Sequence, residues 1–180
     1  MKYKIYKLFF AWQHEKEEKW LNKMSSRGLQ LANVGFCSYV FNEGPPDEYT
    51  YRLELLNELP SHAKSVTYIN FLEETGAEHI GSFFRWVYFR KKTSDGEFDL
   101  YSDIDSKIKH FNRIRTLIFI VGMLNVMPFI NEVNNYFRQD SPLISVISII
   151  QLLLITLLSI GAISITKKIG RLKKEKIFRE

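Results

Sequence analysis

The residues best suited to chemistry form one charged segment near the N-terminus, His14-Glu15-Lys16-Glu17-Glu18. A zinc-protease helix needs a second histidine four residues after the first, so that both imidazoles reach one metal ion. Position 18 is a glutamate, so the spacing excludes such a site. We therefore interpret the segment as the solvated face of a helix, on which Glu17 points to water.

The other histidines and the single cysteine offer no catalytic or metal-binding pattern. His62, His79 and His110 lack matching cysteines or carboxylates, and no glycine-rich loop is placed to hold a phosphate. We expect Cys37 to lie half-buried in a strand as a small apolar residue. The sequence therefore predicts no enzyme, no cofactor and no metal. A buried cleft that collects histidine, glutamate and arginine from distant positions would revive an enzymatic hypothesis.

The first half of the chain alternates between strand and helix patterns. Gly28 and Gly76 are placed to end two helices, and aligning these glycines brings aromatic and aliphatic residues to the same offsets. The sequence therefore predicts an α+β fold built as a duplicated β-α-β-β module in ferredoxin-like style. We expect helices at residues 13–27 and 61–75, and strands at residues 3–10, 29–34, 36–41, 49–56, 77–83 and 84–90.

Two apolar runs follow, at residues 116–130 and 142–166. The second has twenty-five residues without a charge, enough to cross the roughly 30 Å hydrocarbon core of a bilayer as a helix. The first has fifteen residues and crosses only if its flanks extend it; otherwise it lies flat on the membrane surface. We divide the chain into an α+β domain at 1–101, a helical linker at 102–115, a transmembrane hairpin at 116–166 and a basic tail at 167–180.

The positive charge belongs to the membrane flanks. Residues 1–110 hold fifteen Lys/Arg against sixteen Asp/Glu, whereas residues 111–180 hold ten against four. The near-neutral α+β domain lacks the basic surface that nucleic acid requires, so we expect no nucleic-acid partner. Because the loop at 131–141 carries one arginine and the tail is strongly basic, the positive-inside rule predicts a multi-pass protein of the cell membrane with both termini cytoplasmic.

Several side chains are candidates for contacts with partners. Asn125 and Gln151 fall near the middle of the two apolar runs, where they either hydrogen-bond each other or contact a ligand or partner. Ser148 and Ser159 lie on a small-residue seam, with Ser145, Ala162 and Thr166, that allows close helix packing. In the aromatic strand at 84–90, Trp86 and Tyr88 are candidates for a protein-binding patch, provided that they face solvent.

Four blocks carry a family resemblance: FFAWQHEKEEKWLNKMSSRGLQL, YTYRLELL, WVYFRKK and LYSDIDSK, in this order over residues 5–110. They resemble the bacterial family known as domain of unknown function 2812. The resemblance implies a membrane-anchored companion of PadR-type transcriptional regulators, often encoded beside them in Firmicutes. The family has no established activity, so the resemblance implies no functional residues.

We expect a non-enzymatic, membrane-anchored regulatory or adaptor protein whose cytoplasmic domain binds another protein at the inner membrane face. The alternative is an accessory subunit of a membrane transporter or stress-resistance system, which acts through the transmembrane hairpin. The expected partners are a soluble regulator or a membrane protein, together with the membrane itself, and a second copy of the chain is a further candidate.

Overall fold

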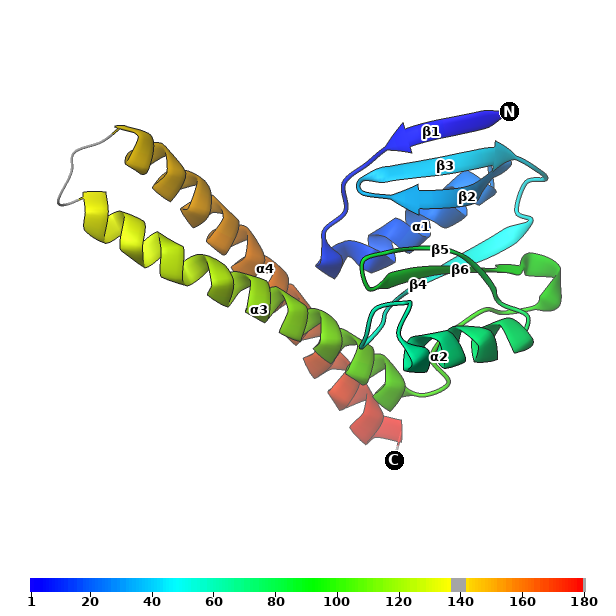
Figure 1. Ribbon diagram of the computed structural model, residues 1–180. Helices are drawn as coiled ribbons and strands as arrows, with labels where there is room; N and C mark the ends of the chain where they lie inside the picture. Colours follow the sequence, from blue (N-terminus) through cyan, green and yellow to red (C-terminus); the bar gives the residue numbers. More distant parts are fainter. Residues whose placement is uncertain (137–141, 180) are drawn as a thin grey trace. The chain divides into compact units, whose positions relative to one another are not determined.

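The computed structural model describes residues 1–136 and 142–179. The chain divides into two compact units, residues 1–106 and 107–180, and each is considered by itself. The first unit is a mixed α+β domain, and the second consists of long helices (Figure 1).

Two three-stranded antiparallel sheets form the α+β domain. The order is β1-β3-β2 in the first sheet and β4-β6-β5 in the second, so the last strand of each set is central. The outer edge of β1 pairs with no strand among the described residues. The strands are β1 (Lys2–Tyr6), β2 (Leu29–Gly35), β3 (Ser38–Glu43), β4 (Tyr49–Leu55), β5 (Glu78–Phe83) and β6 (Trp86–Lys92).

In each set of three strands, one helix lies between the first and the second strand, as expected. Helix α1 (His14–Ser25) follows a short 3₁₀ turn η1 (Ala11–Gln13), and α2 (Ala63–Glu74) lies between β4 and β5. The expected glycine stops are present: Gly28 has φ +77° and Gly76 has φ +89°, conformations that favour glycine.

The strand boundaries differ from the sequence prediction at both hairpin turns. Phe36 and Cys37 form a two-residue turn between β2 and β3, and Phe84 and Arg85 form another between β5 and β6. Cys37 therefore lies in a turn at φ +50°, not in a strand, and Phe84 adopts φ +55°. The strand predicted at 84–90 also ends too early, because β6 continues to Lys92 before the 3₁₀ turn η2 (Thr93–Asp95).

Three polar side chains of α1 hydrogen-bond to the edge of β4 that pairs with no strand among the described residues. We call these side chains the edge stripe: Glu18, Asn22 and Ser25. Asn22 accepts from the N–H of Tyr51 at 2.8 Å and donates to the carbonyl of the same residue at 3.2 Å. Glu18 accepts from the N–H of Leu53 at 2.8 Å. Ser25 donates to the carbonyl of Tyr49 at 2.8 Å. The stripe provides the hydrogen bonds that a further strand would otherwise make.

Side chains also join the two sheets across the gap between β2 and β5. The Leu31 N–H donates to the Tyr51 hydroxyl at 2.9 Å, and Arg90 donates to the Leu31 carbonyl at 3.3 Å. The main apolar core lies between α1 and both sheets: Leu21, Met24, Leu31, Val34, Tyr39, Phe41, Tyr51, Leu53 and Tyr88. Apolar packing and hydrogen bonds between side chains and backbone thus hold the two sheets in one domain.

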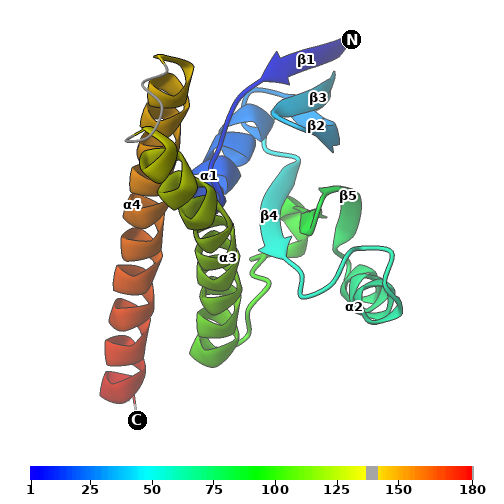
Figure 2. The same ribbon diagram turned by 60° about the vertical axis from the view of Figure 1, so that its left-hand side comes forward.

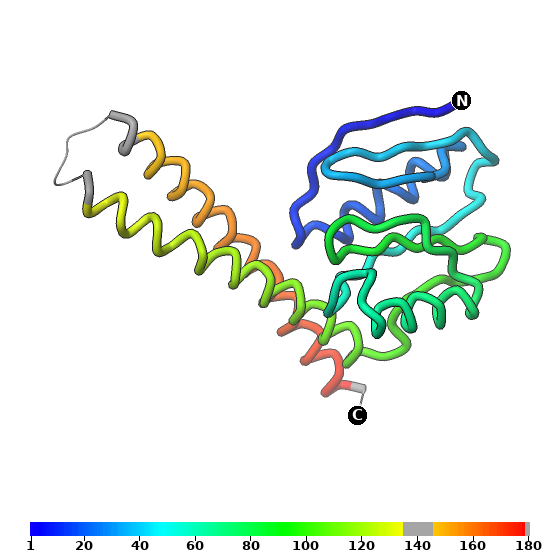
Figure 3. Tube along the Cα trace, in the orientation of Figure 1, coloured from blue at the N-terminus to red at the C-terminus, as the bar shows by residue number. Residues whose placement is uncertain are grey.

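The second unit is formed by α3 (Ile104–Tyr136) and α4 (Pro142–Arg179). Asp103 caps α3 by accepting from the Ser106 N–H at 2.6 Å, and the helix continues without a break into the first apolar run. The two helices lie side by side in both views (Figures 1 and 2), and Figure 3 follows the chain along each. The Lys168 ammonium lies 5.5 Å from the ring centre of Phe111, which links them.

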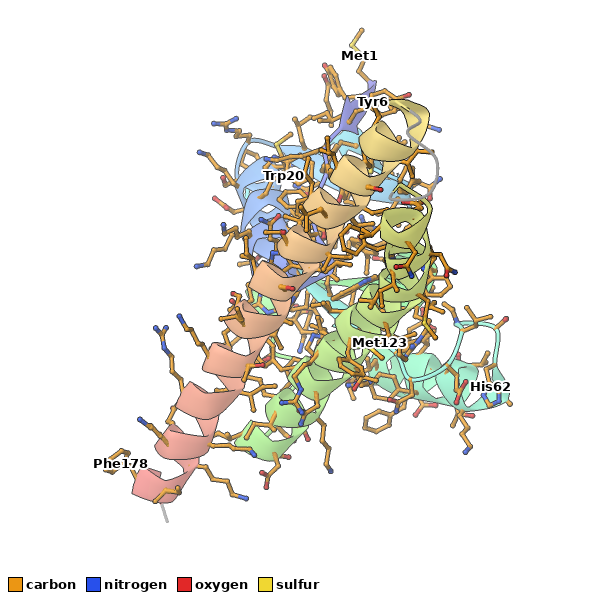
Figure 4. All side chains as sticks on the ribbon, turned by 90° about the vertical axis from the view of Figure 1, so that its left-hand side faces the viewer. Met1, Tyr6, Trp20, His62, Met123 and Phe178 are labelled. Carbon is orange, nitrogen blue, oxygen red and sulfur yellow. The ribbon has the colours of Figure 1, made fainter. Side chains whose placement is uncertain are left out.

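Both long helices have the length and apolar composition needed to cross a membrane. Met123 on α3 and Phe178 near the end of α4, labelled in Figure 4, are 55% and 87% exposed. Many other apolar side chains of these helices are exposed as well: Phe119, Ile120, Leu124, Met127, Ile149, Ile150, Leu153, Ile160 and Ile163. Surfaces of this kind suit lipid contact.

The edge stripe gives the first testable prediction. We expect Asn22→Ala to lower the free energy of unfolding by about 1 to 3 kcal/mol, because the part-buried Tyr51 N–H would lose its acceptor, while the Tyr51 carbonyl would keep only the hydrogen bond from Arg52. Urea unfolding of the full chain in detergent, followed by tryptophan fluorescence, measures this. All three tryptophans, Trp12, Trp20 and Trp86, lie in the α+β domain.

The matched control is Asn70→Ala, which removes an exposed asparagine from α2. We expect it to change the free energy of unfolding by less than about 0.5 kcal/mol. Equal losses for both variants would contradict the role of the edge stripe.

Candidate functional site

A pocket of about 120 Å³ opens in the α+β domain, beside the start of α1 and the two hairpin turns. All of its lining residues belong to the first unit. The lining residues come from separate parts of the sequence, such as Phe10 and His14, Phe36 and Cys37, and Phe83 and Trp86. The pocket therefore exists because the turns of both sheets meet beside the first turn of α1.

A carboxylate held by two phenols lies at this pocket. The hydroxyls of Tyr39 on β3 and Tyr88 on β6 both donate to Oε1 of Glu17, each at 2.7 Å. All three side chains line the pocket, and Glu17 is only 7% exposed. Both hydroxyls thus donate to the same oxygen, and no described residue donates to Oε2 of Glu17. One carboxylate oxygen is therefore left to accept from an occupant of the pocket.

The local sequence explains this arrangement. Because α1 begins at His14, Glu17 lies in the first helical turn, where the helix dipole favours a carboxylate. Tyr39 on β3 and Tyr88 on β6 are both buried in the apolar core that also contains Leu21 and Met24 of α1. Each sheet thus supplies one hydroxyl to the same oxygen.

Burial shifts the acid–base equilibria of this site. Desolvation raises the pKa of Glu17 above its usual value, while the two tyrosine hydrogen bonds oppose the rise. Burial and the neighbouring carboxylate also raise the pKa of Tyr39 and of Tyr88 well above the usual value. Both phenols therefore stay protonated and remain hydrogen-bond donors at neutral pH.

An imidazole and a thiol share the same pocket. The ring of buried His14 lies 5.7 Å from the Trp86 ring, centre to centre, and Cys37 also lines the wall. Histidine and glutamate are thus brought together in a cleft, as an enzymatic hypothesis requires, but arginine is not among the lining residues. The arrangement offers hydrogen-bond acceptance and aromatic contact, which suit ligand binding.

The structure changes the interpretation of three predicted residues. Tyr88 is 6% exposed, so it does not lie on a docking surface, and Trp86 is half-buried in the pocket wall. The prediction that Glu17 faces water is wrong, because α1 packs this side between the two sheets. In the strand expected to display aromatics, only Phe84 is strongly exposed, and it lies in the turn.

The predicted residues of the long helices have other partners. Asn125 donates to the Val121 carbonyl at 2.7 Å, and Gln151 donates to Glu132 at 3.3 Å. The structure therefore does not join Asn125 to Gln151 by a hydrogen bond; a carboxylate on α3 accepts from the Gln151 amide nitrogen instead. Ser148 is part-buried on α4, and the Ser159 hydroxyl donates to the Ile155 carbonyl at 2.8 Å.

Sequence reasoning missed that Glu17 is buried and that the part-buried Glu18 hydrogen-bonds to β4. A weak signal was available, since Glu18, Asn22 and Ser25 follow the four-and-three spacing of one helix face. Polar residues at that spacing are also typical of a solvated face. The pattern alone therefore does not distinguish a solvated helix face from one that contacts a strand edge. Only the position of β4 beside α1 decides between them.

Comparison with known protein families identifies the family of this chain. The family model described as "Protein of unknown function (DUF2812)" matches residues 13–123, which include α1, both sheets apart from β1, and the first part of α3. The family resemblance seen in the sequence blocks is thus confirmed. Neither the curated proteins nor the solved structures contain a match to this chain.

The edge stripe makes folding of the domain sensitive to pH. Burial raises the pKa of Glu18 to about 7, and the hydrogen bond from the Leu53 N–H opposes the rise only in part. Between pH 4.5 and 7 the folded chain keeps a proton that the unfolded chain has released, so the free energy of unfolding falls as pH rises. We expect a decrease of about 3 kcal/mol over this range, levelling off above it.

Glu18→Gln is expected to remove most of that decrease, because the amide oxygen still accepts from the Leu53 N–H without carrying a charge. Urea unfolding at a series of pH values measures the slope, and any slope that remains belongs to other groups such as Glu17. Glu74→Gln, at an exposed position on α2, is the control that keeps the wild-type slope. A wild-type slope in the Glu18 variant would contradict the assignment.

Proposed function

The chain belongs to the DUF2812 family, and we propose that it is a non-enzymatic, membrane-anchored regulatory or adaptor protein. In this proposal the α+β domain binds another protein at the inner face of the membrane, and the two long helices hold it there. The partner is a soluble regulator that is retained at the membrane or released from it.

The observation that carries the proposal is an aromatic patch at the two hairpin turns, formed by Phe36, Phe83 and Phe84. Phe36 is 74% exposed and Phe84 is 60% exposed. The rings of Phe36 and Phe83 lie 5.7 Å apart, centre to centre, so the turns of both sheets contribute to one surface. Exposed aromatic clusters of this kind are typical of protein-binding sites.

The backbone at the patch supports a role beyond folding. Phe84 has φ +55°, a conformation that is costly for a bulky side chain and that glycine adopts freely. A large exposed ring at such a position costs stability and buries little apolar area in return. Retention of strain together with exposure favours a binding role for Phe84.

The membrane part of the proposal concerns orientation. Two helices, residues 104–134 and 146–178, are long and apolar enough to span. We propose that both do so, which makes the protein multi-pass with both termini in the cytoplasm. The excess of Lys and Arg after residue 166 and before residue 116, compared with a single arginine between the apolar runs, supports this orientation.

We also propose that the α+β domain is a duplicated β-α-β-β module in ferredoxin-like style. Both sheets have the same strand order and the same antiparallel pairing when β1, β2 and β3 are aligned with β4, β5 and β6. Both helices follow the first strand of their set and end before a glycine with positive φ. A duplication explains why two matching turns come together at the patch.

The second candidate function is an accessory subunit of a transporter or stress-resistance system. One observation favours it: three buried oxygens of the long helices, Glu132 Oε2, Ser148 Oγ and Gln151 Oε1, have no hydrogen-bond partner among the described residues. Polar groups at membrane depth are costly unless they are paired. A donor from another membrane protein would pair them.

Crosslinking in living cells tests both candidates. With a photoreactive aromatic residue at position 84, we expect capture of a soluble protein, because this side chain is exposed in the patch. The same residue at position 71 is the control, since Phe71 is also exposed but lies on α2. A transporter captured from position 148 would instead support the accessory subunit, and equal capture from positions 84 and 71 would contradict the patch.

A second variant separates binding from folding. Phe84→Gly removes the ring and suits the positive φ, so we expect unchanged or higher stability in urea. Loss of the crosslinked or co-purified partner in this stable variant is the expected result. A variant that still recovers the partner in full would exclude Phe84 from the interface.

Cysteine labelling tests the orientation. Two variants are made on a Cys37→Ala background, which removes the single native cysteine. Ser94→Cys places one thiol in the α+β domain, and Gln139→Cys places one thiol between the two apolar runs. Position 139 lies between the two apolar runs and outside the described residues. In intact cells we expect a membrane-impermeant maleimide to label position 139, and to label position 94 only after permeabilisation. The reverse pattern, or equal labelling of both, would overturn the orientation.

A further inference from the structure

The chemistry of the pocket goes beyond anchoring and protein binding. Glu17 is more than nine-tenths buried, yet it lines an open pocket and has one oxygen to which no described residue donates. A buried carboxylate is costly unless donors or cations compensate for the lost water. The two tyrosine hydroxyls compensate Oε1 only, so the site lacks a donor at Oε2.

The walls of the pocket favour a cationic donor. Trp86, Phe10, Phe36 and Phe83 line the same pocket as the Glu17 carboxylate, and the faces of aromatic rings attract ammonium groups. The chain itself shows this preference in the pocket lining, to which Lys7 and Phe9 both belong: the Lys7 ammonium lies 4.6 Å from the Trp20 ring centre and 5.0 Å from that of Phe9. Lys7 is exposed and engaged by these rings, so water screens its repulsion of a second cation.

We propose that this pocket binds a small primary ammonium compound with a short aliphatic body. One N–H of the ammonium donates to Oε2 of Glu17, and the aliphatic part contacts the aromatic walls. Charge-assisted N–H···O bonds of this type are about twice as strong as neutral ones. The burial that raises the pKa of Glu17 also means that an ammonium would favour its charged form.

The volume limits the size of the ligand. An apolar cavity of about 150 Å³ holds one benzene molecule. A pocket of about 120 Å³ therefore takes about four or five non-hydrogen atoms within its walls. Propylammonium has this size, and propan-1-ol has the same shape without the charge, so the two form a matched pair of probes.

Cys37 provides a reporter inside the pocket, because it lines the wall and is the single cysteine of the chain. We would measure the rate at which a small methanethiosulfonate reagent modifies Cys37 in the full chain in detergent, by mass spectrometry, with sodium chloride matching the ionic strength. Propylammonium is expected to slow the reaction saturably at concentrations up to about 10 mM. Propan-1-ol and tetramethylammonium, which lack the charge or the N–H, are expected to protect at least about tenfold less well.

Variants then identify the carboxylate. Glu17→Gln keeps the shape of the side chain and removes its charge, and we expect the concentration of propylammonium needed for protection to rise at least about tenfold. Glu15→Gln removes the same charge from the same helical turn outside the pocket lining, and we expect no change. If both variants raised this concentration equally, the effect would come from the loss of any nearby negative charge and not from Glu17 itself. That result would overturn the proposal.

Two outcomes in the wild-type chain would also overturn it: no protection by propylammonium, or equal protection by propan-1-ol. These comparisons need no variant, so they hold even if Glu17→Gln fails to fold. The assay needs no partner protein either. Its result is therefore independent of the docking role proposed for the patch.

Discussion

The fold of the α+β domain depends on how the edge of β4 is satisfied. A strand edge that faces α1 has N–H and C=O groups that must be paired, and a helix backbone has none to offer. The edge stripe solves this with three side chains of different chemistry, a carboxylate, an amide and a hydroxyl, one helical turn apart. One face of α1 therefore supplies hydrogen bonds to β4 in place of a neighbouring strand, and its apolar face packs in the core.

This constraint explains which parts of the fold could be predicted from sequence. The helices, the glycine stops and most strands follow local patterns, and they were predicted within a few residues. The turn at Phe84 was not, because neither it nor Arg85 carries the glycine or asparagine signal of tight turns. The site at Glu17 depends on two tyrosines from different sheets, and no local pattern connects residues so distant in sequence.

The same geometry connects the core to the pocket. On α1, Leu21 and Met24 enter the core, Glu18 and Asn22 reach β4, and Glu17 lies one turn earlier at the opening. The tyrosines that hold Glu17 belong to the central strands of their sheets, so the carboxylate is held by two strands that are each paired on both sides. A binding group supported in this way loses little conformational freedom when a ligand arrives.

The open edge of β1 has a consequence for proteins that share a membrane surface. Confinement to two dimensions raises the rate at which exposed strand edges of neighbouring copies meet, and unpaired edges readily form intermolecular sheets. On β1, Lys2 and Lys4 alternate with aromatic and aliphatic residues, and both lysines are exposed. Two such edges brought together would oppose like charges. The charges on Lys2 and Lys4 thus oppose pairing of the outer edge of β1 with the same edge of another copy.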